Sequence, residues 1–337
     1  MVLLLSGCVA TNKTTQVLEK TVPNIEWRSD SFVLVDVPSV ADIFQLSDER
    51  QNHFLNYYYA EANLAVAEHI RLYNYLSDFL DGFDYKGKTY NAHFASTKRA
   101  GNCMSLAVLT KAYASLVNLD IKFKEVNTAP IYQRNSDVTT ISSHIQTHLY
   151  APKKIPQDKV SFGVIRSKII IDYFPTADSF VGNVIEDEDF SAMYYQNVAA
   201  EAIVDGDFDL AYSLLSAAMA LSANNSKTLN TLAVLHKITK NKSLAEAIYV
   251  SEIENQNSTV NMLSNYILLL KEANRIEKVA LMQAKYGEIR DDNPYRWYDL
   301  ANQAYANENA SELAYKPSDE RRYLAKLYAL THNSSDQ

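Results

Sequence analysis

The sequence contains little glycine, proline or cysteine, and it has an excess of negative charge. Among its 337 residues there are eight glycines, eight prolines and two cysteines, and the net charge is −8. So few helix-breaking residues over this length favour a helix-rich protein. The shortage of positive charge excludes a nucleic-acid-binding protein, because no basic patch is available to neutralise phosphates. Hydrophobic residues make up 47% and charged residues 21% of the chain, which excludes a disordered protein and is enough for two folded domains.

A short apolar run lies at the start of the chain. Residues 1–10 read MVLLLSGCVA, a run far too short to cross a bilayer. Its end, Leu5-Ser6-Gly7-Cys8, resembles the lipobox of bacterial lipoproteins. The resemblance implies that residues 1–8 are part of a signal, that the true start lies upstream, and that Cys8 is acylated. A tether would follow over residues 9–30, and the absence of aspartate after Cys8 favours the outer membrane. The alternative is a disordered apolar N-terminus of a soluble protein.

Cys103 opens the segment around which we expect the first domain to be organised. After a polar turn, apolar residues recur at helical spacing at Leu106, Leu109, Tyr113 and Leu116. A thiol in the first turn of a helix experiences the positive potential of unsatisfied backbone N–H groups, which lowers its pKa and favours the thiolate. If Cys8 carries lipid, Cys103 has no disulfide partner, and a lone thiol in an oxidising periplasm indicates catalysis. The alternative is that Cys103 is a small buried hydrophobic residue.

The pattern over residues 31–185 predicts helices followed by strands. A stretch without glycine or proline at 49–80 predicts one long helix or two consecutive helices. A polar stretch at 127–143 predicts a loop. Apolar or alternating runs predict strands at 31–37, 121–126, 144–150, 160–164 and 168–173. Helices first and then a meander of strands indicate an α+β fold.

Two further residues complete a possible catalytic group. A cysteine nucleophile needs a base to take its proton and a third group to orient that base. His144 lies at the start of a predicted strand, and Asp172 is embedded in the apolar run of a later strand, where a carboxylate is costly unless paired. His148 is the alternative base, because it falls on the same strand face. His93 is predicted to be a partly buried structural histidine.

A metal site is the other chemical alternative. It would combine Cys103 with His93, His144 and His148. Their spacings do not resemble compact zinc motifs, so we expect no metal. The acidic run at 186–189 is predicted to be a solvated linker.

These residues together resemble the transglutaminase-like superfamily. The match comprises Gly101-Asn102-Cys103-Met-Ser105-Leu-Ala107, then His144 and then Asp172, and it covers about residues 49–175. The resemblance implies a papain-like core over 31–185, with Cys103 as nucleophile, His144 as general base and Asp172 as orienting acid. Members of the superfamily transfer acyl groups to amines or hydrolyse amides. The mechanism it implies needs no cofactor.

The rest of the chain has a 34-residue period. Ala199, Ala233 and Ile267 share one phase, and Ala211, Ala245 and Val279 share a second. The next step reaches Ala301, within a stretch that resembles the first helix of a tetratricopeptide repeat. We therefore predict an all-α solenoid of three to four tetratricopeptide-like repeats over 190–331. The alternative is an unrelated helical bundle.

These features predict a bacterial cell-envelope lipoprotein that faces the periplasm and is held by its lipid alone. Its cysteine domain would cleave or transfer amide or acyl bonds in proteins or peptides through a thioester. The solenoid would bind a protein partner on its concave surface. The alternative function is a non-catalytic envelope scaffold that binds partners through the repeats.

Overall fold

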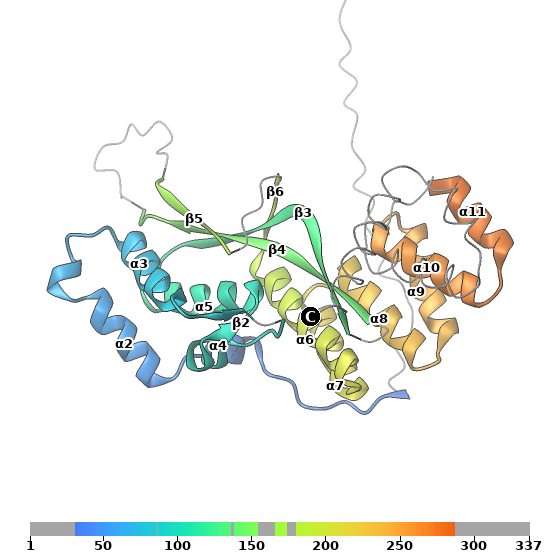
Figure 1. Cartoon of the computed structure of the whole chain (residues 1–337), viewed down its shortest axis with the longest axis horizontal. Helices are drawn as coiled ribbons and strands as arrows, with labels where there is room; N and C mark the ends of the chain where they lie inside the picture. Colours follow the sequence, from blue (N-terminus) through green and yellow to red (C-terminus); the bar gives the residue numbers. More distant parts are fainter. Residues whose placement is uncertain (1–30, 86, 136–137, 154–165, 174–179, 287–337) are drawn as a thin grey trace, which may run out of the picture.

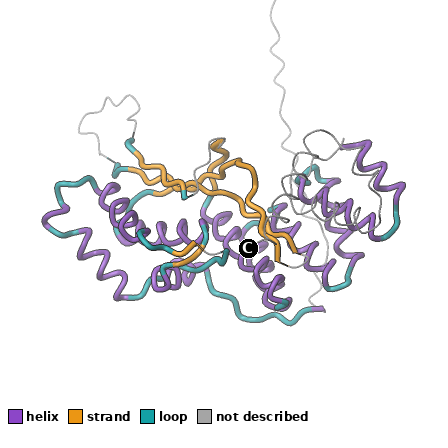
Figure 2. Tube along the Cα trace, in the orientation of Figure 1, coloured by secondary structure: helices purple, strands orange, loops and turns teal. Residues whose placement is uncertain are grey.

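The computed structural model describes residues 31–85, 87–135, 138–153, 166–173 and 180–286 (Figure 1). The fold is mixed α+β and mostly helical, with a small sheet and a helical C-terminal region. Figure 2 shows the helices gathered beneath one face of the sheet and continuing beyond its end. Within the described ranges, no helix has the length and apolarity that a membrane crossing requires.

The first half of the chain supplies short capped helices. The prediction of two consecutive helices in 49–80 is confirmed. The five α-helices are α1 (Val40–Phe44), α2 (Asp48–Tyr58), α3 (Glu68–Leu80), α4 (Ala92–Lys98) and α5 (Cys103–Leu116). Serine caps begin two of them, because the hydroxyl oxygens of Ser39 and Ser47 accept N–H groups of the first turn.

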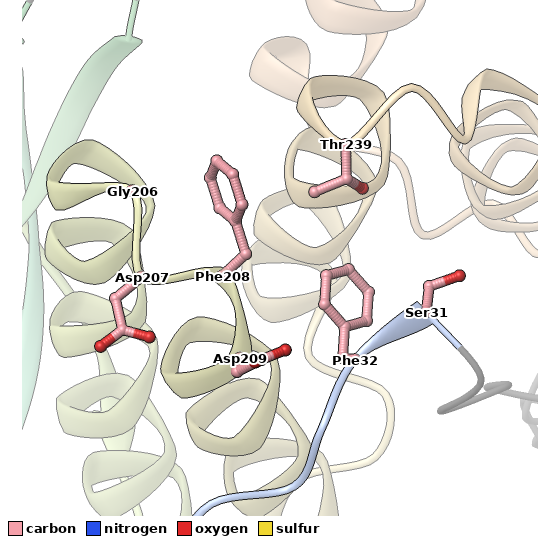
Figure 3. Close-up of a pocket in the computed structure, with 7 residues that line it drawn as sticks. All are labelled: Ser31, Phe32, Gly206, Asp207, Phe208, Asp209 and Thr239. Atoms are coloured by element: carbon pink, nitrogen blue, oxygen red, sulfur yellow. The ribbon is translucent and has the colours of Figure 1, made fainter.

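The predicted strand at 31–37 is wrong. Among the described residues this segment pairs with no strand. It lies beside the helix that carries Asp209 (Figure 3), and side chains of that helix accept hydrogen bonds from its backbone. The backbone N–H of Val33 donates to Asp209 Oδ1 at 2.9 Å, and that of Val35 donates to Ser213 Oγ at 3.0 Å.

An antiparallel sheet covers α5. Its strands lie in the order β5-β4-β3-β6, and they are β3 (Ile121–Asn135), β4 (Val138–Tyr150), β5 (Lys168–Asp172) and β6 (Phe180–Ile185). The predicted loop at 127–143 is wrong, since β3 and β4 continue through most of it as a long hairpin. The sequence analysis missed β6. The strand predicted at 160–164 lies outside the described residues.

The second half consists of helices in consecutive pairs. They are α6 (Asp187–Asp205) with α7 (Phe208–Leu221), α8 (Ser226–Ile238) with α9 (Lys242–Glu254), and α10 (Val260–Glu272) with α11 (Ile276–Tyr286). All six positions of the 34-residue pattern are buried in these helices: Ala199, Ala233, Ile267, Ala211, Ala245 and Val279. The period therefore marks equivalent core positions. Residues 287–331, with the stretch around Ala301, lie outside the described residues.

The two halves share one hydrophobic core. The Phe123 ring of β3 stacks on the Phe190 ring of α6 with 3.8 Å between centroids. The predicted linker at 186–189 is wrong, because Asp187, Glu188 and Asp189 form the first turn of α6, where acidic side chains favour the helix dipole. Asp187 also pairs with Lys111 of α5 at 2.6 Å.

Candidate active site around Cys103

Cys103 is the first residue of α5, as predicted. Asn102 is the N-cap, and its Oδ1 accepts the backbone N–H of Ser105 at 3.0 Å. Ser105 Oγ in turn accepts the backbone N–H of Asn102 at 3.3 Å, which completes a capping box. The asparagine and serine of the Gly-Asn-Cys-x-Ser motif thus fix the start of the helix that carries the thiol.

Gly101 has no substitute at this turn. Its φ is +147°, and an added Cβ would lie 2.5 Å from the Cβ of Ser105. The tight approach lets Ser105 Oγ accept the backbone N–H of Tyr90 at 2.7 Å. On the other side of the turn, Ala100–Gly101 (β2) pairs in parallel with Asp84–Tyr85 (β1). Gly101, Asn102 and Ser105 of the motif therefore each have a structural role.

The thiol lies in a shielded polar environment. Cys103 is 3% exposed, and it lies at the N-terminal end of α5, where the helix dipole is positive. Two phenols are close enough to interact with its charge. Burial raises the pKa of Tyr85, and a negative charge on Cys103 raises it further. Burial also raises the pKa of Tyr173, again with a contribution from Cys103.

Tyr173 connects the cysteine helix to the sheet. Its phenol oxygen lies 2.7 Å from Thr110 Oγ1 and 3.3 Å from the Leu106 carbonyl, both on α5. The same oxygen lies 3.2 Å from Thr147 Oγ1 on β4. Because Tyr173 directly follows Asp172, this network holds the end of β5 against the first two turns of α5. Sequence analysis missed Tyr173, although a tyrosine next to the predicted acid was visible.

The structure gives Asp172 a partner that sequence analysis did not predict. Gln146 Nε2 donates to Asp172 Oδ2 at 2.6 Å, and the two residues are register partners on β4 and β5. An amide that donates to a carboxylate favours its ionised form and fixes its orientation. The costly carboxylate in an apolar strand is therefore hydrogen-bonded, as the burial argument required.

His144 is placed by its backbone. It lies in β4 opposite Val126 of β3, and its side chain lies outside the described residues. Helix α5 and strand β4 run in the same direction, because Asp120, just after α5, accepts the N–H of Tyr150 at the end of β4. Cys103 precedes the contact at Leu106, and His144 precedes the contact at Thr147. Both backbones therefore lie towards the same end of the packed pair. Thr147 and Tyr173 face α5, so Gln146 and Asp172, which alternate with them, lie on the other face of the sheet from Cys103.

His148 is poorly placed and poorly suited to act as the base. It follows Thr147 on β4, and so lies on the other side of the Tyr173 contact from Cys103. Its Nδ1 is 3.2 Å from Lys168 Nζ. Burial, helped by Lys168 and Lys124, lowers the pKa of His148 to about 4, which keeps it neutral and weakly basic at pH 7. These contacts and the low pKa count against His148 as the base.

The remaining predicted residues lie elsewhere. His93 is on α4 with its ring 5.3 Å from the Phe94 ring, and the prediction that it is partly buried is confirmed. In the part of the chain that the structure describes, no three His, Cys, Asp or Glu side chains are grouped as a metal site. Cys8 lies outside the described residues.

No protein-family model, no curated protein and no solved structure matches this chain.

Proposed function

We propose that the chain is a cysteine-dependent acyl-transfer enzyme of the transglutaminase-like type. The Cys103 thiolate would attack an amide carbonyl, and the C–N bond would break as His144 protonates the leaving amine. The resulting thioester would then react with water or with a second amine. The observation that carries this proposal is the position of Cys103 at the capped N-terminus of α5, a helix that Tyr173 connects to β4.

Each remaining group has a role in this proposal. Asp172, oriented by Gln146, would hold the imidazole of His144 in the tautomer that accepts the thiol proton. Backbone N–H groups at the start of α5 would bind the oxyanion, since they concentrate positive potential there. Water is the favoured acceptor in an aqueous periplasm, so we propose amidase or protease activity before crosslinking.

The cellular setting is part of the same proposal. A lipid on Cys8 would hold the protein at the periplasmic side of the outer membrane. The helix pairs α6–α7, α8–α9 and α10–α11 would bind a protein partner as tetratricopeptide-like repeats. The equivalent buried positions of the 34-residue period support this assignment.

One observation favours the alternative of a non-catalytic scaffold. With 3% of Cys103 exposed, its sulfur is shielded from solvent, as expected for a structural thiol. In that case the cysteine domain would serve only as a rigid support for the repeats.

Labelling of Cys103 tests the two functions. In a Cys8→Ser background, Cys103 is the only thiol, so mass spectrometry of the iodoacetamide-treated protein reports on it alone. If Cys103 and His144 form a catalytic group, Cys103 should be labelled at pH 7, and its labelling rate should fall at least tenfold in His144→Ala. His148→Ala is the matched control on the same strand and should keep the parent rate. Equal labelling of parent and His144→Ala would support the scaffold.

A further inference from the structure

A chain of hydrogen bonds connects the cap of the cysteine helix to the first helix of the repeats. Asn102, whose Oδ1 caps α5, donates from Nδ2 to Thr89 Oγ1 at 2.8 Å. The backbone N–H of Thr89 donates to Glu201 Oε1, on α6, at 2.6 Å. The Thr89 side chain is hydrogen-bonded to the same carboxyl group. Residues separated by about a hundred positions thus meet next to Cys103.

The donors and acceptors give this chain one direction. The Asn102 amide nitrogen is a donor only, so the Thr89 hydroxyl oxygen must accept from it. That hydroxyl has one proton, with which it donates a hydrogen bond to the Glu201 carboxylate. When it is ionised, the carboxylate can act only as an acceptor. Fixing the amide nitrogen of Asn102 on Thr89 leaves its Oδ1 facing the N–H of Ser105. The Glu201 carboxylate therefore determines the orientation of the Asn102 side-chain amide, which caps α5.

We propose that Glu201 is a positioning residue for Cys103, acting through Thr89 and Asn102, so that docking of the repeat domain sets the geometry of the thiol. The proposal rests on the proposed function of Cys103 as a nucleophile. It makes α6 part of the machinery of the cysteine domain. Partner binding that moves α6 would then change the reactivity of Cys103.

The charges around Glu201 give the chain a pH dependence. Burial raises the pKa of Glu201 to about 7, against the opposing effects of the Thr89 hydrogen bonds and of Lys88. Asp205, one turn further along α6, also raises it, and Tyr194 on the same helix interacts with its charge. Above pH 7 the ionised carboxylate accepts both hydrogen bonds from Thr89. Below pH 7 protonation removes part of its accepting capacity, and the hold on Asn102 weakens.

Four variants in the Cys8→Ser background test the chain. Thr89→Val removes the hydroxyl without changing charge, and Thr89→Ser keeps it. Glu201→Gln removes the carboxylate. Glu188→Gln is the control for charge on α6, because Glu188 is exposed in the first turn of the helix. The measurement is the iodoacetamide labelling rate of Cys103 in the full-length protein from pH 6 to pH 8.5.

The expected result is a loss of rate that depends on pH. Glu201→Gln should label about threefold more slowly than the parent at pH 8.5 and at the parent rate at pH 6, from the size of a helix-terminus effect. Thr89→Val should show the same loss at pH 8.5. Thr89→Ser and Glu188→Gln should follow the parent. The double variant of Thr89→Val with Glu201→Gln should lose no more than either change alone.

Two results would overturn the proposal. One is labelling of Cys103 in Thr89→Val at the parent rate at pH 8.5. The other is a ratio of parent to Glu201→Gln labelling rates that is the same at pH 6 and at pH 8.5. If Thr89→Val does not fold, the comparison of Glu201→Gln with the parent still decides. Failure of the proposed function has a different signature, namely equal labelling of parent and His144→Ala. Hydrogen exchange at Ser105 then tests the chain, and an unchanged rate in Glu201→Gln at pH 8.5 would contradict it.

Discussion

The contacts that stabilise the helix pairs are local in sequence, whereas those that stabilise the cysteine domain join distant segments. In the helix pairs, a buried hydrophobic residue recurs every 34 positions, at an equivalent place in each pair. Around Cys103, the contacts come from separate segments that contain Tyr85, Thr89, Tyr173 and Glu201. A repeat can tolerate a local defect because its neighbours carry their own cores. The site at Cys103 forms only when all of these segments are packed in place.

This difference bears on how the two regions would be regulated. Glu201 belongs by sequence to the repeats but by hydrogen bonding to the cysteine site. A helix that serves both regions can transmit a change in one to the other, provided that it has two positions. The contrast between local and convergent contacts is therefore the property to test.

The largest expected difference concerns two glycines with positive φ. Gly101→Ala should cost about 4 kcal/mol and abolish the labelling of Cys103, because its Cβ would meet Ser105 at 2.5 Å in a strained backbone. Gly206→Ala, at the end of α6, should cost only about 1 kcal/mol, since nothing lies within 4 Å of its added Cβ. Urea unfolding of both variants measures the difference. Similar losses would show that the two regions tolerate change equally.

A second difference appears as pH rises. The pKa of Glu201 is raised from 4.5 to about 7, so the folded state binds a proton that the unfolded state has lost. Stability is therefore lost as pH rises through this window, by about 3 kcal/mol in total. Glu201→Gln removes the titration. We expect the unfolding free energy of the parent, relative to Glu201→Gln, to fall by that amount between pH 4.5 and pH 7.5. A constant difference across the window would contradict the assignment.

The helix pairs were predictable from the sequence because their determinants are local and periodic. Ala199 and Ala233 indicate their burial by spacing alone, and both are buried. Helix α5 was also predictable, since Asn102 and Ser105 form its capping box within a few residues of Cys103. The residues that predict this helix therefore lie in the same turn that they stabilise.

The contacts around the site could not be read in the same way. Gln146 reaches Asp172 only because β4 and β5 pair in one register, and register depends on the whole sheet. Glu201 reaches Thr89 only because α6 packs beside the cysteine domain. The segment at 31–37 has the sequence pattern of a strand, but its backbone N–H groups donate to Asp209 and Ser213, which no local pattern reveals.

A third prediction concerns acid, which should act on the helix pairs. His236 on α8 is buried, and burial lowers its pKa from 6.5 to about 4. Neither ring nitrogen has a hydrogen-bond partner among the described residues. The unfolded state therefore gains a proton first, and stability is lost as pH falls from 6.5 to 4, by about 3 kcal/mol. His236→Leu should remove this loss, opposite in sign to the effect of Glu201. Parallel pH curves for parent and variant would contradict it.

The smallest expected effect lies where the two regions meet at the surface. Lys227 of α8 forms an ion pair with Glu125 of β3, and both side chains are about one-third exposed (37% and 35%). An exposed pair contributes about 0.5 kcal/mol, and salt screens it. A double-mutant cycle of Lys227→Met and Glu125→Gln, measured by urea unfolding at low and high salt, should give a coupling of this size that disappears at high salt. A coupling above about 2 kcal/mol that survives salt would mean that surface charge, and not the shared core around Phe123 and Phe190, holds the repeats on the cysteine domain.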